Sequence, residues 1–152
     1  MQAGNEARPI LREAEPFPGT VPVSEERLIL LAEDDTELRS LLAETLREDG
    51  YRVLEARDGV ELIDRLEEAV AMRVRHGTQL ALVVTDVRMP GLSGLDILGL
   101  LGCTRWQVPV LVVTAFGDAE THTEAQRLHA RAVLDKPFEI DAFRKEVERC
   151  AV

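Results

Sequence analysis

Residues 79–94 read QLALVVTDVRMPGLSG. The run at positions 80–84 is entirely apolar, partly β-branched and too short for a typical helix, which predicts a strand covered on both faces of a parallel sheet. Polar side chains return only at Thr85 and Asp86, and Pro90-Gly91 then breaks the backbone. Asp86 is therefore predicted at the carboxyl end of a buried strand, the edge where open α/β sheets bind ligands.

The composition is that of a soluble globular protein. The 152 residues are 45% apolar and 30% charged, which favours one domain with a substantial core. The net charge of −10 argues against direct nucleic-acid binding, because a phosphate backbone attracts a clustered basic surface. No membrane-spanning run or signal peptide is visible, and the distant Cys103 and Cys150 favour reduced thiols. A cytoplasmic protein without a membrane partner is expected.

The amino-terminal part differs from the rest. Residues 1–26 contain four prolines and no sustained periodicity, which predicts a disordered leader before a single domain at residues 27–152. The domain begins with an apolar run at residues 28–32 that ends in three acids, as a first buried strand would. Asp35 or Thr36 can then cap a helix that Gly50 ends, with an apolar face formed by Leu38, Leu41, Leu42 and Leu46.

A second strand and helix follow. Residues 51–56 predict a more exposed strand, after which Asp58-Gly59 opens a helix with an inner stripe of Val60, Ile63, Leu66 and Val70. The basic segment 72–78 is interpreted as cations at the helix C-terminus, where the dipole favours them, rather than as a binding patch.

Three further strands and helices complete the pattern. Strands are predicted at residues 80–85, 109–114 and 132–134. Helices are predicted at about residues 93–101 and from the turn at 116–118 to about 128. A last amphipathic helix closes the chain, with Ile140, Phe143 and Val147 on its inner face. Five strands alternating with five helices on short connections predict right-handed crossovers and a parallel sheet with helices on both faces.

If the sheet is parallel, four strands present polar side chains at one edge. Converging carboxylates call for a hard divalent cation, and Mg²⁺ suits one or two carboxylates completed by water and a phosphate. A carboxylate can attack phosphorus when nearby cations neutralise the transferring group. These roles are assigned as follows: Asp86 is the candidate nucleophile, Asp34 with support from Glu33 holds the metal, Thr114 donates to a phosphate oxygen, and Lys136 supplies a mobile positive charge.

Each residue also has a simpler explanation. Asp86 alone could be a turn residue and Lys136 alone a solvated lysine, but their joint position at strand ends favours a site. Asp35 is interpreted as a helix cap and is left out of the metal site. The histidines at positions 76, 122 and 129 share no ligand spacing, so they are interpreted as surface or partly buried side chains.

These residues resemble the receiver domain of bacterial two-component response regulators, the CheY-like family, over about residues 28–150. Four motifs carry the resemblance in the family's order, each after a predicted strand: EDD at 33–35, VTDVRMPGLSG at 84–94, VTAFGD at 113–118 and DKPF at 135–138. The residues around Asp86 and Thr114 are most similar to receivers of the nitrogen-regulation type.

The resemblance implies a flavodoxin-like fold with strand order 2-1-3-4-5. It further implies that Asp86 accepts a phosphoryl group from the phosphohistidine of a sensor histidine kinase or phosphotransfer protein, with Mg²⁺ held by Asp34, Asp86 and the main-chain carbonyl of Arg88. Thr114 and Lys136 would contact the phosphoryl group and relay its presence to the face made by the fourth and fifth helices and the last strand. The Lys136–Pro137 bond would be cis, as is common in the family.

Three features depart from the family pattern or vary within it. Val133 stands where the family usually has an aromatic switch residue, and His129-Ala130 replaces a small Gly-Ala pair at the end of the fourth helix. Arg88 and Phe116 lie near the phosphorylation site at positions that influence the lifetime of the acyl phosphate.

The resulting hypothesis is a phosphoaccepting receiver without an output domain, which signals through an unknown downstream protein, with a homodimer as a further option. It is not an independent enzyme, although it would catalyse its own phosphorylation and dephosphorylation. The first alternative is a pseudo-receiver, an interaction module that works without phosphorylation. A hydrolase with an aspartyl-phosphate intermediate would need a carboxylate where Arg88 stands, and a flavin carrier would need a phosphate-binding loop after the first strand.

Overall fold

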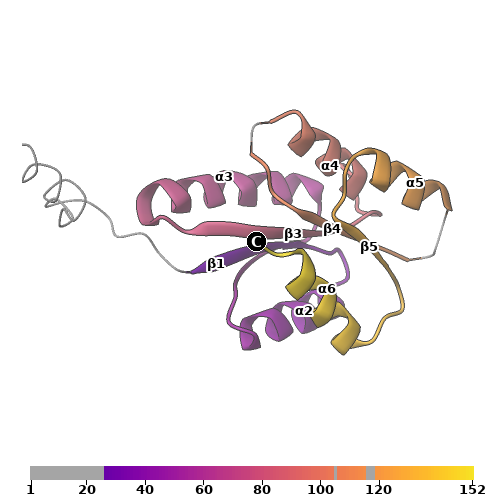
Figure 1. Ribbon diagram of the computed structural model, residues 1–152, viewed down its shortest axis with the longest axis horizontal. Coiled ribbons are helices and arrows are strands. Elements are labelled where there is room, and N and C mark those ends of the chain that lie inside the picture. Colours follow the sequence, from indigo (N-terminus) through magenta and orange to yellow (C-terminus); the bar gives the residue numbers. More distant parts are fainter. Residues whose placement is uncertain (1–25, 105, 116–118) are drawn as a thin grey trace, which may run out of the picture.

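The computed structural model describes residues 26–104, 106–115 and 119–152. Its five parallel strands form one sheet in the order β2-β1-β3-β4-β5, which confirms the predicted flavodoxin-like topology (Figure 1). The strands are β1 Arg27–Ala32, β2 Arg52–Ala56, β3 Gln79–Asp86, β4 Val110–Thr114 and β5 Ala132–Asp135, and the helices are α2 Thr36–Glu48, α3 Gly59–His76, α4 Gly94–Gly102, α5 Ala119–Arg127 and α6 Ile140–Cys150.

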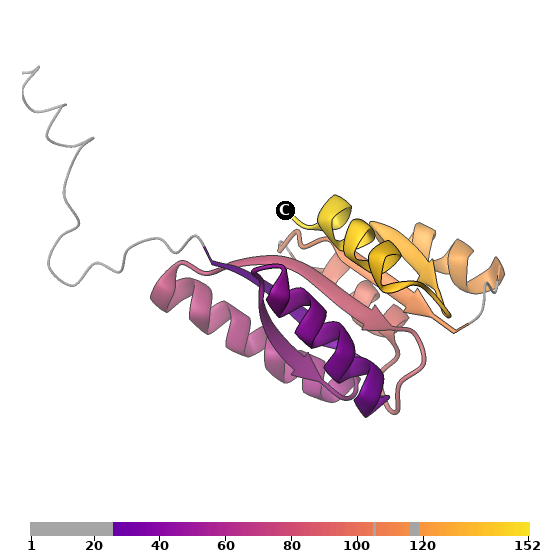
Figure 2. The same cartoon turned by 90° about the horizontal axis from the view of Figure 1, so that it is seen from below.

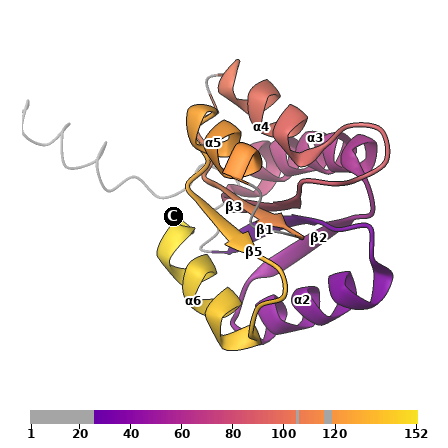
Figure 3. The same ribbon diagram turned by 90° about the vertical axis from the view of Figure 1, so that its right-hand side faces the viewer.

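Two apolar layers enclose the sheet, because successive strand residues point to opposite faces. Leu28 and Leu30 of β1 pack on one side with α3, α4 and α5. Ile29 and Leu31 pack on the other side with α2 and α6. Figure 3 shows α2 and α6 together beneath the sheet, opposite the other three helices, and in Figure 2, seen from below, these two helices lie on the near side of the sheet. Every residue of β3 after Gln79 is buried, as predicted for a strand covered on both faces.

The helix boundaries have local causes. Asp35 caps α2 by accepting a hydrogen bond from the Leu38 N–H at 3.1 Å, which confirms its interpretation as a cap. Asp58 caps α3 in the same way, accepting from Glu61 N at 2.8 Å. At the other end of α3, Gly77 adopts the left-handed conformation with φ 68°, and the last turn carries three basic residues, as the dipole favours.

The predicted inner faces of two helices were partly wrong. Val60 and Val70 of α3 are 58% and 45% exposed, whereas Leu62 and Ala69 are buried against the sheet. The buried stripe of α3 is therefore rotated relative to the predicted one, and it includes the small residues Gly59 and Ala69, which hydrophobic periodicity gives little weight. Leu41 of α2 is likewise 46% exposed, since it lies beside the buried row rather than within it.

Two loops next to β5 have unusual backbone geometry, of which the family resemblance implied only the first. The Lys136–Pro137 peptide bond is cis, and His129, just after α5, has a positive φ of 69°. The predicted turn at residues 116–118 and the predicted leader up to residue 25 lie outside the described residues. Within the described part of the chain, no helix has the length and apolar character needed to cross a membrane.

Candidate functional site

The parallel sheet brings four strand ends together at its carboxyl edge. Ala32 at the end of β1 pairs with Thr85 of β3, so Glu33 and Asp34 follow directly beside Asp86. On the other side of β3, Asp86 pairs with Val113, the residue before Thr114. The N–H of Lys136 donates to the Thr114 carbonyl at 2.7 Å, which ties the end of β5 to the end of β4.

Lys136 connects the two buried carboxylates of the site. Its Nζ atom donates to Glu33 Oε1 at 2.8 Å and to Asp86 Oδ2 at 3.0 Å. Glu33 is 2% exposed and Asp86 5% exposed, so both acids are largely removed from water. Buried carboxylates are costly unless they are paired, and here one ammonium serves both.

Glu33, Asp34 and Asp86 form a cluster that could hold a metal ion. One carboxylate oxygen from each lies within 4.8 Å of the others. Asp34 is exposed, so the cluster opens to solvent on its side. Oxygen ligands of this kind suit a hard cation such as Mg²⁺, which keeps several water ligands. The donor set therefore fits Mg²⁺.

The pKa values of Glu33 and Lys136 reflect an excess of negative charge at the site. Burial raises the pKa of Glu33 to about 7, although hydrogen bonds from Lys136 and from the Asp35 N–H oppose that shift. Burial acts on the Lys136 ammonium in the opposite direction, but its hydrogen bonds to Glu33 and Asp86 outweigh burial and hold its pKa above the ordinary value. One ammonium does not neutralise three carboxylates, and a divalent cation at the cluster would favour the charged form of Glu33.

The loop after β3 is held closely against Asp86. Arg88 N donates to Asp86 Oδ1 at 3.2 Å, so Asp86 also forms the turn that its sequence context suggested. The Arg88 side chain is exposed beside it. At the start of α4, a Cβ on Gly94 would lie 2.2 Å from the Asp86 carbonyl oxygen, so only glycine fits there. The path of the chain after Asp86 depends on this close contact.

Thr114 and Val133 lie on neighbouring strands beside the cluster. Thr114 is 4% exposed at the end of β4. Val133 pairs with Val112 in the sheet and is only half-buried, packed on the layer that includes α5. The side chain at the family's switch position is therefore a small aliphatic one in partial contact with solvent.

Sequence reasoning missed Arg39 of α2. Its Nη1 donates to the Glu33 carbonyl at 2.8 Å, and its Nε lies 3.4 Å from Glu55 Oε1 of β2. Arg39 thereby fixes the backbone that carries the acidic pair. Its position one helical turn after Asp35 places Arg39 near the acidic run, but this spacing does not identify its partner, a main-chain carbonyl.

Comparisons with known proteins identify the family and the fold of this chain. The family model described as "Response regulator receiver domain" matches residues 29–148. The response regulator protein FleR of Pseudomonas aeruginosa is 36% identical over 124 residues, which cover 82% of this chain and 24% of FleR. Sporulation initiation phosphotransferase F of Bacillus subtilis is 29% identical over 121 residues, 80% of this chain and 90% of that protein. The chain thus spans about a quarter of one relative and most of the other.

Solved structures share the fold. A response regulator receiver domain protein from Clostridium thermocellum superposes with a TM-score of 0.70 at 25% identity, covering 81% of this chain and 92% of that one. The chemotaxis response regulator CheY4 of Vibrio cholerae gives a TM-score of 0.70 at 23% identity, covering 82% and 98%. With the family model matching most of its length, the chain belongs to the response regulator receiver domain family of two-component systems.

Proposed function

We propose that Asp86 accepts a phosphoryl group from the phosphohistidine of a sensor kinase or phosphotransfer protein, and that the modified chain binds a downstream partner differently. The observation that carries this proposal is the Lys136 ammonium bound to both Asp86 and Glu33. A carboxylate acts as a nucleophile toward phosphorus when positive charge is already placed beside it.

In the transfer step, an oxygen of Asp86 forms a bond to phosphorus while the phosphorus–nitrogen bond of phosphohistidine breaks. The electron pair of that bond leaves with the imidazole nitrogen, and the product is an acyl phosphate. The Lys136 ammonium offsets the charge on the phosphoryl oxygens, and the Thr114 hydroxyl donates a hydrogen bond to one of them. Hydrolysis by water returns Asp86 to its free form.

Glu33, Asp34, Asp86 and the main-chain carbonyl of Arg88 would hold Mg²⁺. When bound, Mg²⁺ supplies the positive charge that the single ammonium lacks. Arg88 and Phe116 would set the lifetime of the acyl phosphate by controlling water access, and replacement of either by Ala is expected to change the rate of autodephosphorylation.

The effect of phosphorylation would pass from the site to the protein surface through the ends of β4 and β5. Rearrangement of Thr114 and Lys136 around the phosphoryl group pulls on the ends of β4 and β5, which are joined by the 2.7 Å hydrogen bond. The face of α5, β5 and α6 would then change its affinity for a partner protein, as a population shift between two arrangements. In this proposal residues 27–152 act as the receiver unit in the cytoplasm, without direct nucleic-acid contact.

The test is phosphoryl uptake from acetyl phosphate, followed by intact mass with and without Mg²⁺. Wild type and Asp64→Asn, which changes an exposed acid of α3, should gain the mass of one phosphoryl group only when Mg²⁺ is present. Asp86→Asn should gain none. A folded wild type that takes up no phosphoryl group would refute the proposal and leave the phosphorylation-independent interaction module.

A further inference from the structure

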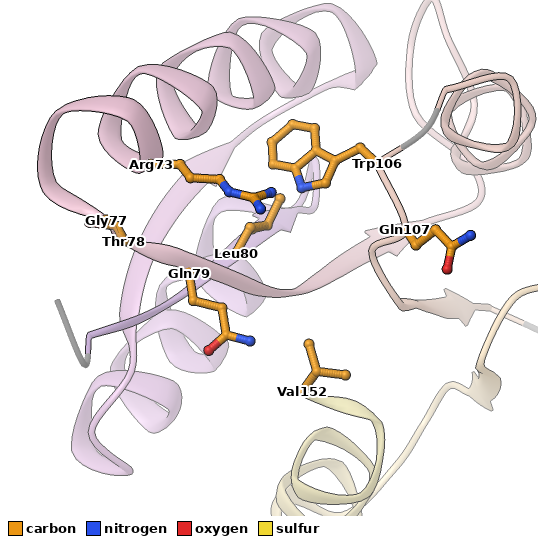
Figure 4. A pocket seen from close by; sticks show the side chains of 8 residues that line it. All are labelled: Arg73, Gly77, Thr78, Gln79, Leu80, Trp106, Gln107 and Val152. Carbon is orange, nitrogen blue, oxygen red and sulfur yellow. The ribbon is translucent and has the colours of Figure 1, made fainter. Parts of the chain in front are cut away.

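A second concave site lies at the edge of the sheet opposite Asp86. This pocket, here called the amino-edge pocket, has a volume of about 700 Å³ and is lined by Arg73, Thr78, Gln79, Leu80, Trp106 and Gln107 (Figure 4). Gln79 begins β3 and Asp86 ends it, so the pocket and the phosphorylation site are separated by about 23 Å of strand. Nothing in the proposed phosphoryl chemistry uses it.

The pocket combines an aromatic ring with a cation. Trp106, the only tryptophan of the chain, is half-buried, and its ring faces the pocket on the same side as the Arg73 guanidinium (Figure 4). Within residues 26–104, 106–115 and 119–152, no carboxylate pairs with Arg73, and no acceptor is recorded for the indole N–H of Trp106. Gln79 and Gln107 add exposed amide donors. The pocket is therefore suited to a segment with carboxylates, flat apolar rings and main-chain carbonyls.

The chain enters the domain at the rim of this pocket. The N–H of Gln79, a lining residue, donates to the Glu26 carbonyl at 3.3 Å. The preceding 25 residues are thus tethered beside the pocket, which gives them a high effective concentration there. Ten extended residues span about 31 Å, more than enough to reach across it.

The leader also has matching chemistry. Residues 13–22 read EAEPFPGTVP and contain two acids and three prolines. Proline rings dock on aromatic side chains because the chain is already extended and little conformational entropy is lost. Arg73 and Arg75, in the same turn of α3, give a local positive charge in a chain of net charge −10. This charge would attract acidic side chains such as those of Glu13 and Glu15.

We propose that the amino-edge pocket binds residues 13–22 of the same chain, with Glu13 and Glu15 against Arg73 and the prolines against Trp106. This binding is independent of phosphorylation at Asp86. It makes the pocket an intramolecular docking site for the leader, at the end of the sheet remote from the receiver chemistry.

Trp106 provides the readout, since it is the only tryptophan. In the full chain, the double variant Glu13→Lys/Glu15→Lys should shift Trp106 emission to longer wavelength and raise the acrylamide quenching constant about twofold, because the ion pairs that hold the leader are lost. Glu37→Lys, which reverses an exposed acid at the start of α2, should leave both quantities unchanged.

Arg73→Glu should have the same effect as the leader variant, and combining it with Glu13→Lys/Glu15→Lys should restore emission and quenching toward wild type. Phosphoryl uptake at Asp86 should be equal in all these variants, so failure of this proposal is separate from failure of the proposed function. The proposal would be overturned if acrylamide quenching were unchanged in both Glu13→Lys/Glu15→Lys and Arg73→Glu. It would also be overturned if the combined variant did not return emission and quenching toward the wild-type values. Emission that depends on protein concentration, which would indicate docking between copies, would overturn it as well.

Discussion

Lys136 and Asp86 are joined by a 3.0 Å contact between an ammonium and a carboxylate, although 50 residues separate them in sequence. The same ammonium lies 2.8 Å from Glu33, which is 103 residues away. Residues at the ends of three strands therefore meet at one positive charge, and we expect that charge to influence both the stability and the reactivity of this edge.

Replacing Lys136 with Gln should weaken both properties. Two buried carboxylates would lose their cation, so the free energy of unfolding without metal should fall by about 1–3 kcal/mol. Phosphoryl uptake with Mg²⁺ should fall on the order of 100-fold, because a charge aimed at the transferring group is lost. Urea denaturation and the rate of mass gain with acetyl phosphate measure the two effects.

Lys145→Gln is the matched control, because Lys145 is exposed on α6. It should leave stability within about 0.5 kcal/mol of wild type and uptake unchanged. Equal uptake by Lys136→Gln and Lys145→Gln would show that the ammonium of Lys136 has no part in the transfer.

The raised pKa of Glu33 predicts a pH-dependent stability. Because folding raises this pKa from 4.5 to about 7, the folded chain binds more protons than the unfolded chain between these values. The metal-free protein should therefore lose stability as the pH rises through this window, by at most about 1.4 kcal/mol per pH unit. Glu33→Gln should flatten the profile of unfolding free energy against pH measured by urea denaturation. In the wild-type protein at pH 7.5, adding Mg²⁺ should recover the stability lost between pH 5 and pH 7.

Glu67→Gln, at an exposed position of α3, should keep the wild-type slope. If Glu33→Gln and Glu67→Gln retained the same slope between pH 5 and pH 7, the pH dependence would belong to another group.

Two glycines of α4 give a paired test of the close contact with Asp86. A Cβ at Gly94 would lie 2.2 Å from the Asp86 carbonyl oxygen, whereas a Cβ at Gly99 meets nothing within 4 Å. Gly94→Ala should destabilise the protein by about 1–3 kcal/mol and slow phosphoryl uptake, because the backbone of Asp86 must shift. Gly99→Ala should be neutral or stabilising by up to about 1 kcal/mol. Similar stabilities for the two variants in urea would mean that the loop adapts without moving Asp86.

The sheet was predictable from sequence because its signals are local. Each buried strand is a short apolar run, and polar residues such as Asp86 and Thr114 return where the strand meets the ligand edge. Parallel topology then places these ends together without any knowledge of distances. The order of strands came from family resemblance, since periodicity alone does not distinguish it.

Packing between elements was less predictable. Val60 is more apolar than Gly59, yet Val60 is exposed and Gly59 is buried. Gly59 packs so closely on the Leu92 backbone that a Cβ would lie 2.3 Å from the Leu92 carbonyl oxygen. Arg39 was overlooked because its partner at Glu33 is a main-chain carbonyl, which has no sequence signature. Both cases depend on contacts between different segments of the chain, and hydrophobic periodicity carries no information about such contacts.

The two cysteines should differ sharply in reactivity. Cys103 is exposed after α4, whereas Cys150 is fully buried on α6 and burial raises the pKa of its thiol. A thiol-reactive aromatic disulfide at pH 8 should therefore modify one thiol rapidly and the second only after unfolding in urea, because the thiolate is the reactive form. Cys103→Ser should abolish the rapid phase, and Cys150→Ala should leave it intact. Rapid modification of two thiols in the native wild type would show that the C-terminal end of α6 separates from the sheet.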